Sequence, residues 1–127
     1  MVVASGHSPQ SIGTKLTVVK IPTHIKKPVY YVGELMRIRI TSKEILPQYL
    51  FYYLQTKEGY KAIHECVEGV HLVQGRAKKM KIIKPDINIQ KRIVADMEGQ
   101  QKVIDESKKV IEKAKVKQKE IIDKIFT

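Results

Sequence analysis

The sequence lacks the features of an exported, disulfide-linked or membrane-spanning protein. Its single cysteine, Cys66, cannot form an internal disulfide, and such cysteine usage is typical of a reducing, cytoplasmic setting. No run of about 18 apolar residues is present, which argues against a transmembrane helix. The first residues have neither the charged nor the apolar region of a signal peptide. We therefore expect a cytoplasmic protein that does not enter a membrane.

Residues arranged for catalysis are also lacking. The chain has no phosphate-binding glycine loop, and its four histidines do not follow the spacing of zinc ligands. The nearest approach to a ligand cluster is His64–Cys66 with His71, but a lone cysteine beside a histidine is usually structural. No Ser, His and Asp spacing matches a known hydrolase motif. We expect no catalytic residue, no metal and no cofactor, and a binding protein rather than an enzyme.

Acidic residues are scarce compared with basic ones, and the formal net charge is +11. Residues 1–86 hold fourteen Lys and Arg against six Asp and Glu, whereas residues 87–127 hold ten against seven. An excess of positive charge in the first part favours a polyanionic partner, most often nucleic acid. Many basic proteins bind no nucleic acid, so charge alone leaves both interpretations open.

Proline is absent after Pro85, and Gly99 is the only glycine beyond that point. Apolar residues recur there at alternating spacings of four and three, which predicts one long helix over 87–127, capped by Asp86 or Asn88. Its seam for a partner helix comprises Ile93, Met97, Gln100, Ile104, Ser107, Ile111, Ala114, Gln118, Ile121 and Ile125. Polar seam residues weaken a coiled coil but fix its register and partner.

Residues 1–86 show short strand and helix signals. Strands are expected over 1–4, 16–21, 29–40 and 79–84, and helices over 46–55 and 60–67. The aromatic run 49–53 predicts core packing more strongly than base stacking. The predicted fold is α+β: a small mixed α/β domain over 1–86, followed by one long coiled-coil-type helix over 87–127.

Basic and amide side chains indicate where DNA would bind. Arg and Gln can recognise base edges, whereas lysines mostly contact phosphates. In the loop from Gly69 and the residues after it, the candidates are His71, Gln74, Arg76, Lys78 and Lys79. Other candidates are Lys26 and Lys27 in a loop, and Arg37 and Arg39 on one face of a predicted strand. A solvated loop and a solvated sheet face are the plainer alternatives.

Four segments resemble, in the same order, parts of the specificity subunits of type I restriction-modification systems. LPQYLFYYL at Leu46–Leu54 is similar to that family's (N/L)PEYLYYYL helix. KIIKPDINIQKRIV at Lys81–Val94 resembles its strand-Pro-Pro-Leu-x-x-Gln-x-x-Ile junction, with Asp86 in place of the second proline. Residues Ile104–Phe126 are similar to its long helix, and Ser5–Gly13 is similar to its Ser-x-Gly-x-x-Gly turn.

The resemblance implies a non-catalytic DNA-recognition subunit, with a target recognition domain that reads half of a split DNA site. It implies two partners, double-stranded DNA and methyltransferase subunits docked on the long helix, whereas the seam of that helix predicts pairing with a second copy in a homodimer. S-adenosylmethionine, ATP and Mg would belong to other subunits. Since the family's recognition domains are longer, residues 1–86 are expected to form only the C-terminal part of one. An alternative is a helical module that docks a methyltransferase or another specificity subunit without binding DNA.

Overall fold

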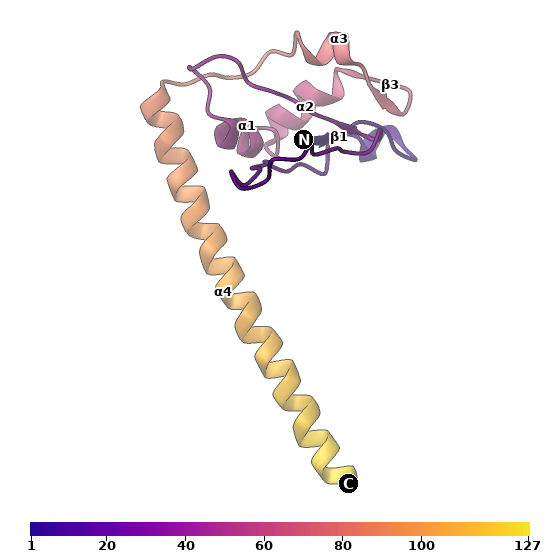
Figure 1. The fold of residues 1–127 in the computed structure, drawn as a ribbon, viewed down its shortest axis with the longest axis vertical. Coiled ribbons are helices and arrows are strands. Elements are labelled where there is room, and N and C mark those ends of the chain that lie inside the picture. The colour runs from indigo at the N-terminus through magenta and orange to yellow at the C-terminus, as the bar shows by residue number, and fades with distance from the viewer. The chain divides into compact units, whose positions relative to one another are not determined.

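The computed structural model describes residues 1–127, apart from the side chain of Val3. The predicted fold class is confirmed: a small mixed α/β part is followed by one long C-terminal helix (Figure 1). The chain divides into two compact units, Met1–Lys91 and Arg92–Thr127. The boundary therefore falls within the long helix, five residues after the predicted end of the first domain at residue 86.

The N-terminal segment is paired on both of its edges. Strand β1 (Val2–Val3) pairs antiparallel with β2 (Leu35–Met36). Val2 also forms an isolated bridge to Leu16, and the Thr17 backbone N–H donates to the Met1 carbonyl at 3.0 Å. The N-terminus consequently lies among the other segments of this unit (Figure 1).

A second small sheet adjoins the same segment. Strands β3 (Val67–Glu68) and β4 (His71–Leu72) form a hairpin, in which Gly69 has a φ of +59°. A positive φ at the first turn position is what a type II′ hairpin turn requires. The Leu72 backbone N–H donates to the Ala4 carbonyl at 2.7 Å. The N-terminal segment thus connects the two two-stranded sheets.

Most of the predicted strands were wrong. Of residues 29–40 only Leu35–Met36 form a strand, of 16–21 only Leu16 forms a bridge, and 79–84 form none. Val and Ile favour strands because they pack well against neighbouring strands, and this preference does not supply a neighbour. The predicted loop over 69–75 was also wrong, because it contains β4 and the start of helix α3 (Gln74–Ala77).

Two helices build the small core. Helix α1 (Pro47–Tyr53) has Pro47 in its first turn, as predicted. Helix α2 (Lys57–His64) begins three residues earlier than predicted. The buried apolar residues are Val2, Ile12, Tyr49, Leu50, Tyr53, Leu54, Ile63, Cys66 and Leu72. Core packing of the aromatic run is confirmed for Tyr49 and Tyr53, which are buried, whereas Phe51 and Tyr52 are only half-buried.

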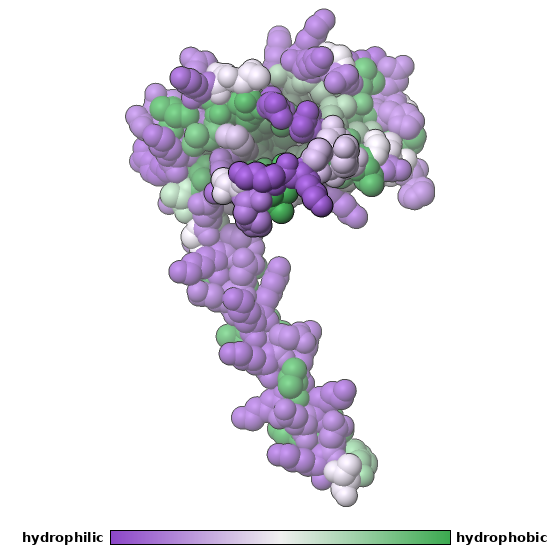
Figure 2. Space-filling view, viewed as in Figure 1, coloured by the Kyte–Doolittle hydropathy of each residue, from purple (hydrophilic) through white to green (hydrophobic). Residues whose placement is uncertain are grey.

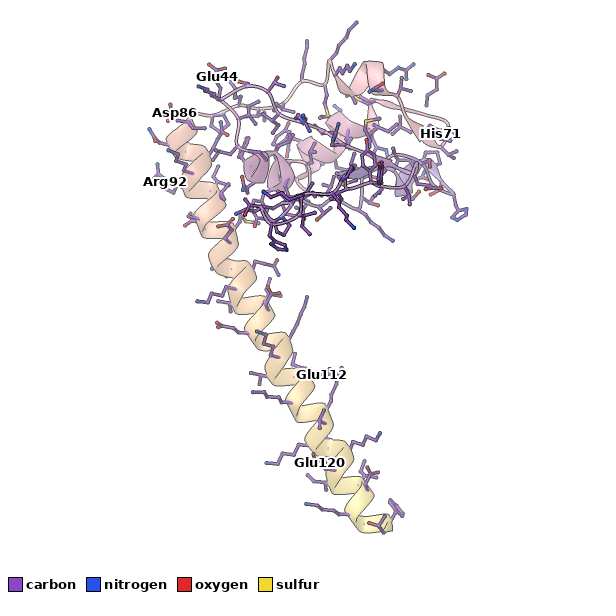
Figure 3. All side chains as sticks on the ribbon, in the orientation of Figure 1. Glu44, His71, Asp86, Arg92, Glu112 and Glu120 are labelled. Atoms are coloured by element: carbon purple, nitrogen blue, oxygen red, sulfur yellow. The ribbon has the colours of Figure 1, made fainter. Side chains whose placement is uncertain are left out.

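Helix α4 (Ile87–Phe126) starts within the first unit. The Asn88 backbone N–H donates to Asp86 Oδ1 at 2.8 Å, so Asp86 caps the helix, one of the two predicted choices. Gln90 is fully buried and hydrogen-bonds to the segment around Glu44. Figure 3 shows Glu44 and Asp86 near the beginning of the helix.

Beyond Lys91, every side chain of α4 except that of Val94 is exposed. The exposed fraction is 36% for Ile93, 54% for Ile111 and 71% for Ile125. Figure 2 accordingly shows hydrophobic residues interspersed with hydrophilic ones along the helix surface. Within the described part of the chain, no helix is both long enough and apolar enough to span a bilayer.

Candidate nucleic-acid interface

A hollow beside α3 brings basic side chains together. Arg76, Lys78, Lys79 and Lys81 all line it, and Glu65 is the acidic residue among its walls. All four basic side chains are exposed, and among the described residues Lys78, Lys79 and Lys81 form no ion pair. Several positive charges around one concave surface raise the local potential and attract polyanions. We call this surface the basic hollow.

The hairpin before α3 fixes the position of the basic hollow. The Val73 backbone N–H donates to the Cys66 carbonyl at 2.9 Å, which closes the base of the hairpin. Helix α3 begins immediately afterwards and carries Arg76. The Lys78 backbone N–H then donates to the Gln74 carbonyl, which continues the helical turn into the lysine run. Local backbone hydrogen bonding, rather than a strand as predicted, therefore orients these lysines.

Arg76 is held against the hairpin. Its Nη2 lies 3.0 Å from Glu68 Oε2, and its Nη1 donates to the Val67 carbonyl at 3.5 Å. Both members of this ion pair are more than half exposed, so the pair contributes only about 0–1 kcal/mol to stability. Its main effect is to orient the guanidinium. A guanidinium has five N–H donors, so Arg76 keeps donors for a ligand beside its contacts with Glu68 and Val67.

His71, Gln74 and Arg37 line a second hollow, together with Ser5, Glu34 and Tyr31. These residues come from three separate parts of the sequence, which the pairing of the N-terminal segment with β2 and β4 brings together. The Arg37 guanidinium carbon lies 5.9 Å from the centre of the Tyr31 ring, a cation–π distance. His71 is exposed on β4 (Figure 3). This mixed hollow holds donors and acceptors suited to base edges.

The other predicted residues are not in these two hollows. Lys26 and Lys27 are exposed in a loop and line neither surface. Arg39 lines an apolar groove, to which Arg37 also contributes. The predicted alternation is present in the exposure pattern, because Arg37 and Arg39 are exposed while Ile38 between them is partly buried. A strand was predicted there, but β2 ends at Met36.

Lys81 was missed by the sequence analysis as a site residue. It lines the basic hollow with Lys78 and Lys79. The available signal was its position in the run Lys78-Lys79-Met80-Lys81, which was interpreted as the start of a strand. Lys84 follows in sequence but forms a surface ion pair with Glu44, so it is not part of the hollow.

Cys66 and His64 have structural partners. The Cys66 thiol is buried and donates to the Ala62 carbonyl at 3.4 Å. Burial and the Glu65 carboxylate raise the pKa of the Cys66 thiol, although Arg76 opposes this effect. A raised pKa keeps the thiol protonated and weakly reactive at neutral pH. His64 Nε2 lies 3.1 Å from the Ile12 carbonyl oxygen. The described residues include no group of three His, Cys, Asp or Glu that could hold a metal ion.

The two hollows thus both include residues of α3, with Gln74 in the mixed hollow and Arg76 in the basic hollow. No protein-family model, curated protein sequence or solved structure matches the chain.

Proposed function

We propose that this chain is a DNA-recognition part of a type I restriction-modification specificity subunit. The observation that carries the proposal is the gathering of Arg76, Lys78, Lys79 and Lys81 in the basic hollow. The resemblance of Leu46–Leu54 and Lys81–Val94 to that family supports it. In this proposal the chain binds double-stranded DNA and has no catalytic residue of its own, and the protein works in the cytoplasm.

The two hollows would have different tasks. Lysines in the basic hollow contact phosphates and place the protein on the duplex, which contributes affinity without sequence information. His71, Gln74 and Arg37 in the mixed hollow then face base edges, where Gln pairs with adenine and Arg with guanine. Lys26, Lys27 and Arg39 add positive charge outside the hollows. Binding would therefore depend strongly on salt and weakly on sequence when only the basic hollow is engaged.

Helix α4 supplies the second half of the proposal. Its apolar seam is exposed from Ile93 to Ile125, so a second helix can cover it without disturbing a core. The proposed partners are methyltransferase subunits and a second copy of this chain. S-adenosylmethionine, ATP and Mg would be bound by the partner subunits in this assembly.

DNA binding is tested by fluorescence anisotropy of the full chain with a labelled random duplex over a range of salt concentrations. The test variant combines Lys78→Ala, Lys79→Ala and Lys81→Ala. Each lost phosphate contact lowers the slope of log K against log salt by about 0.9, so the triple variant is expected to lose a slope of about 3. The matched control replaces three exposed lysines of α4, Lys109, Lys113 and Lys117, with Ala.

The control separates a local surface from general positive charge. Both triple variants lower the net charge by the same amount, so a merely non-specific attraction predicts equal losses. A larger loss in the basic hollow supports the proposal. Equal losses, or no binding by the unaltered chain at low salt, would refute a DNA interface at this hollow.

The alternative function is a helical docking module that does not bind DNA. It is favoured by one observation, the complete exposure of the α4 seam beyond Lys91. Sedimentation equilibrium of the full chain measures pairing, and Ile111→Lys on the seam should abolish it. Val116→Lys, which replaces an exposed valine off the seam, is the control. Pairing without any DNA binding would establish the alternative, and a strictly monomeric chain would remove self-pairing from both proposals.

A further inference from the structure

An apolar groove in the unit Met1–Lys91 is open to solvent. Its walls come from residues 16–19, Ile21, 29–31 and 37–40, and from Leu50 and Leu54 in and just after α1. The exposed large apolar residues of this region are Val18, Val19, Ile21, Ile25, Val29, Tyr30, Tyr31 and Val32. Figure 2 shows a hollow with hydrophobic walls and hydrophilic surroundings on the visible face of this unit. A cluster of exposed apolar residues on this scale marks an interaction surface.

The backbone beside the groove is available for pairing. On one side, the pairing of the N-terminal segment with residues 16–17 ends at Thr17. On the other side, its partner strand β2 ends at Met36. Among the described residues, the backbone N–H groups of 18–21 and 37–40 have no backbone partner. Both segments contain the β-branched residues that favour strands, and both line the groove. Such an edge is a template for a strand from another chain.

Charge around the groove selects the occupant. Within residues 15–40, Glu34 is the only acidic residue, and the basic residues are Lys15, Lys20, Lys26, Lys27, Arg37 and Arg39. Arg37 and Arg39 line the groove itself. A partner with acidic residues is therefore complementary, whereas a second copy of this chain would bring the same positive charge to the interface. The phosphates of DNA match the charge but not the apolar walls.

We propose that the apolar groove binds an extended segment of a partner protein, in which alternating apolar residues are flanked by Asp or Glu. The segment adds a β-strand to the free backbone of 18–21 or 37–40. Its apolar side chains cover Val19 and Ile21, and its acidic flanks face Arg37 and Arg39. Main-chain hydrogen bonds supply affinity in this mode, and side-chain pockets supply specificity. This surface shares Arg37 with the mixed hollow but uses no residue of the basic hollow, and it does not depend on the proposed DNA binding.

Hydrogen exchange of the full chain, alone and with a synthetic peptide, tests the pairing. The peptide alternates valine and threonine between glutamate flanks, and a twin peptide carries lysine flanks. In the free chain the amides of 18–21 and 37–40 should exchange rapidly, since they have no backbone partner. The glutamate peptide should slow exchange in one of these segments by about tenfold or more, and the lysine peptide should not.

Substitutions locate the surface. Val19→Ser with Ile21→Ser should weaken peptide binding by about tenfold or more, because two apolar contacts are lost. Both side chains are 51% exposed, so the variant should fold, which circular dichroism can check. The control, Val110→Ser with Val116→Ser, changes exposed valines of α4 and should leave binding unchanged. Arg37→Glu with Arg39→Glu should reverse the preference between the two peptides.

Three results would overturn this proposal. Slow exchange in both segments of the free chain would mean that their backbone is already paired. Equal binding of the two peptides, or binding of neither, would remove the acidic strand as the occupant. Self-association of the chain that the Val19 and Ile21 substitutions abolish would identify a second copy instead. DNA binding should be unaffected by those substitutions, which separates this surface from the basic hollow.

Discussion

Gly59 and Gly99 each lie inside a helix, one in each compact unit, and their surroundings are opposite. A Cβ on Gly59 of α2 would lie 2.0 Å from the Tyr53 carbonyl oxygen, whereas nothing lies within 4 Å of such an atom on Gly99 of α4. Two glutamines of α4 differ in the same way, because Gln90 is fully buried and Gln100 is exposed. Residues 1–91 thus contain a core with specific contacts, whereas almost every side chain of the helix beyond Lys91 is exposed.

The largest difference is expected between Gly59→Ala and Gly99→Ala. The added methyl of Gly59→Ala meets the Tyr53 carbonyl and the Leu54 Cα, which are backbone atoms that cannot rotate away. We expect a loss of about 3 kcal/mol or more in the free energy of unfolding, at the high end for overpacking. Gly99→Ala should instead stabilise the helix by about 1 kcal/mol, because alanine is the better helix former.

Urea denaturation of Gly59→Ala and Gly99→Ala measures the change in the free energy of unfolding that each substitution causes. Near-ultraviolet circular dichroism follows the tyrosines, all of which lie in the first unit, and far-ultraviolet dichroism follows the helices. Similar effects of the two substitutions would contradict the close contact of α1 with the start of α2.

The next largest effect is expected at Gln90. Its Oε1 accepts from the Leu46 backbone N–H at 3.0 Å, and its Nε2 donates to the Glu44 and Pro85 carbonyls at 2.8 Å each. Gln90→Leu would leave one partly buried N–H and two carbonyls without these partners. We expect a loss of about 2–3 kcal/mol in the free energy of unfolding of the first unit, since each unsatisfied group is costly.

Gln100→Leu is the matched control for Gln90→Leu. Both variants replace a glutamine of α4 with leucine, and Gln90 lies three residues before Ile93, the first seam residue. Gln100 differs from Gln90 in being exposed. The control should leave the tyrosine signal of the first unit unchanged. An equal loss at both positions would mean that the hydrogen bonds of Gln90 do not hold α4 to the first unit.

Helix periodicity explains why α1 and α4 were predicted well. Pro47 and Asp86 mark the beginnings of these helices, and their apolar spacing is local information that needs no knowledge of the rest of the chain. The same periodicity could not distinguish Gln90 from Gln100. Gln90 is buried because it contacts a segment more than 40 residues away in sequence, around Glu44 and Leu46. Gln100 has no such segment beside it.

The strands and the geometry of the candidate site also depend on contacts between residues that are distant in sequence. Val18 and Val19 have the composition of a strand, but the described residues place no partner beside them. In the site, the basic residues were identified from the sequence, whereas their separation into two hollows follows from the pairing of Ser5 with His71. Lys81 could not be assigned to the site from the sequence, because its β-branched neighbours Ile82 and Ile83 are typical of a strand.

A smaller effect per side chain is expected from Gln100→Leu with Gln118→Leu, if α4 pairs as proposed. Leucine at these seam positions should stabilise the paired helices by about 1–2 kcal/mol per buried side chain. It should also loosen the choice of register and partner, which polar seam residues restrict. Thermal unfolding at several protein concentrations measures the gain, and mixing with a differently tagged seam variant measures selectivity. Lys113→Leu, on the opposite face, is the control; unchanged stability and pairing in the double variant would count against the seam.

The smallest effect is expected at the Glu44 side chain, which ends in solvent while its backbone carbonyl is held by Gln90. The hydrogen bond and the charge of Lys84 lower the pKa of the Glu44 carboxyl below its ordinary value of 4.5. A lowered pKa means that the ion pair stabilises the folded state above pH 4.5 and that this contribution disappears as the pH falls through the lower, folded-state pKa.

Glu44→Gln should therefore shift the urea midpoint slightly at neutral pH and not at all once the carboxyl of the unaltered chain is protonated. Both members of the pair are largely exposed, and exposed ion pairs contribute little. Glu44 and Gln90 lie in one contact, so this comparison ranks an exposed charge pair against a buried neutral network at the same place. A larger shift for Glu44→Gln than for Gln90→Leu would reverse that ranking. It would also mean that electrostatic attraction, rather than satisfied backbone hydrogen bonds, holds the start of α4.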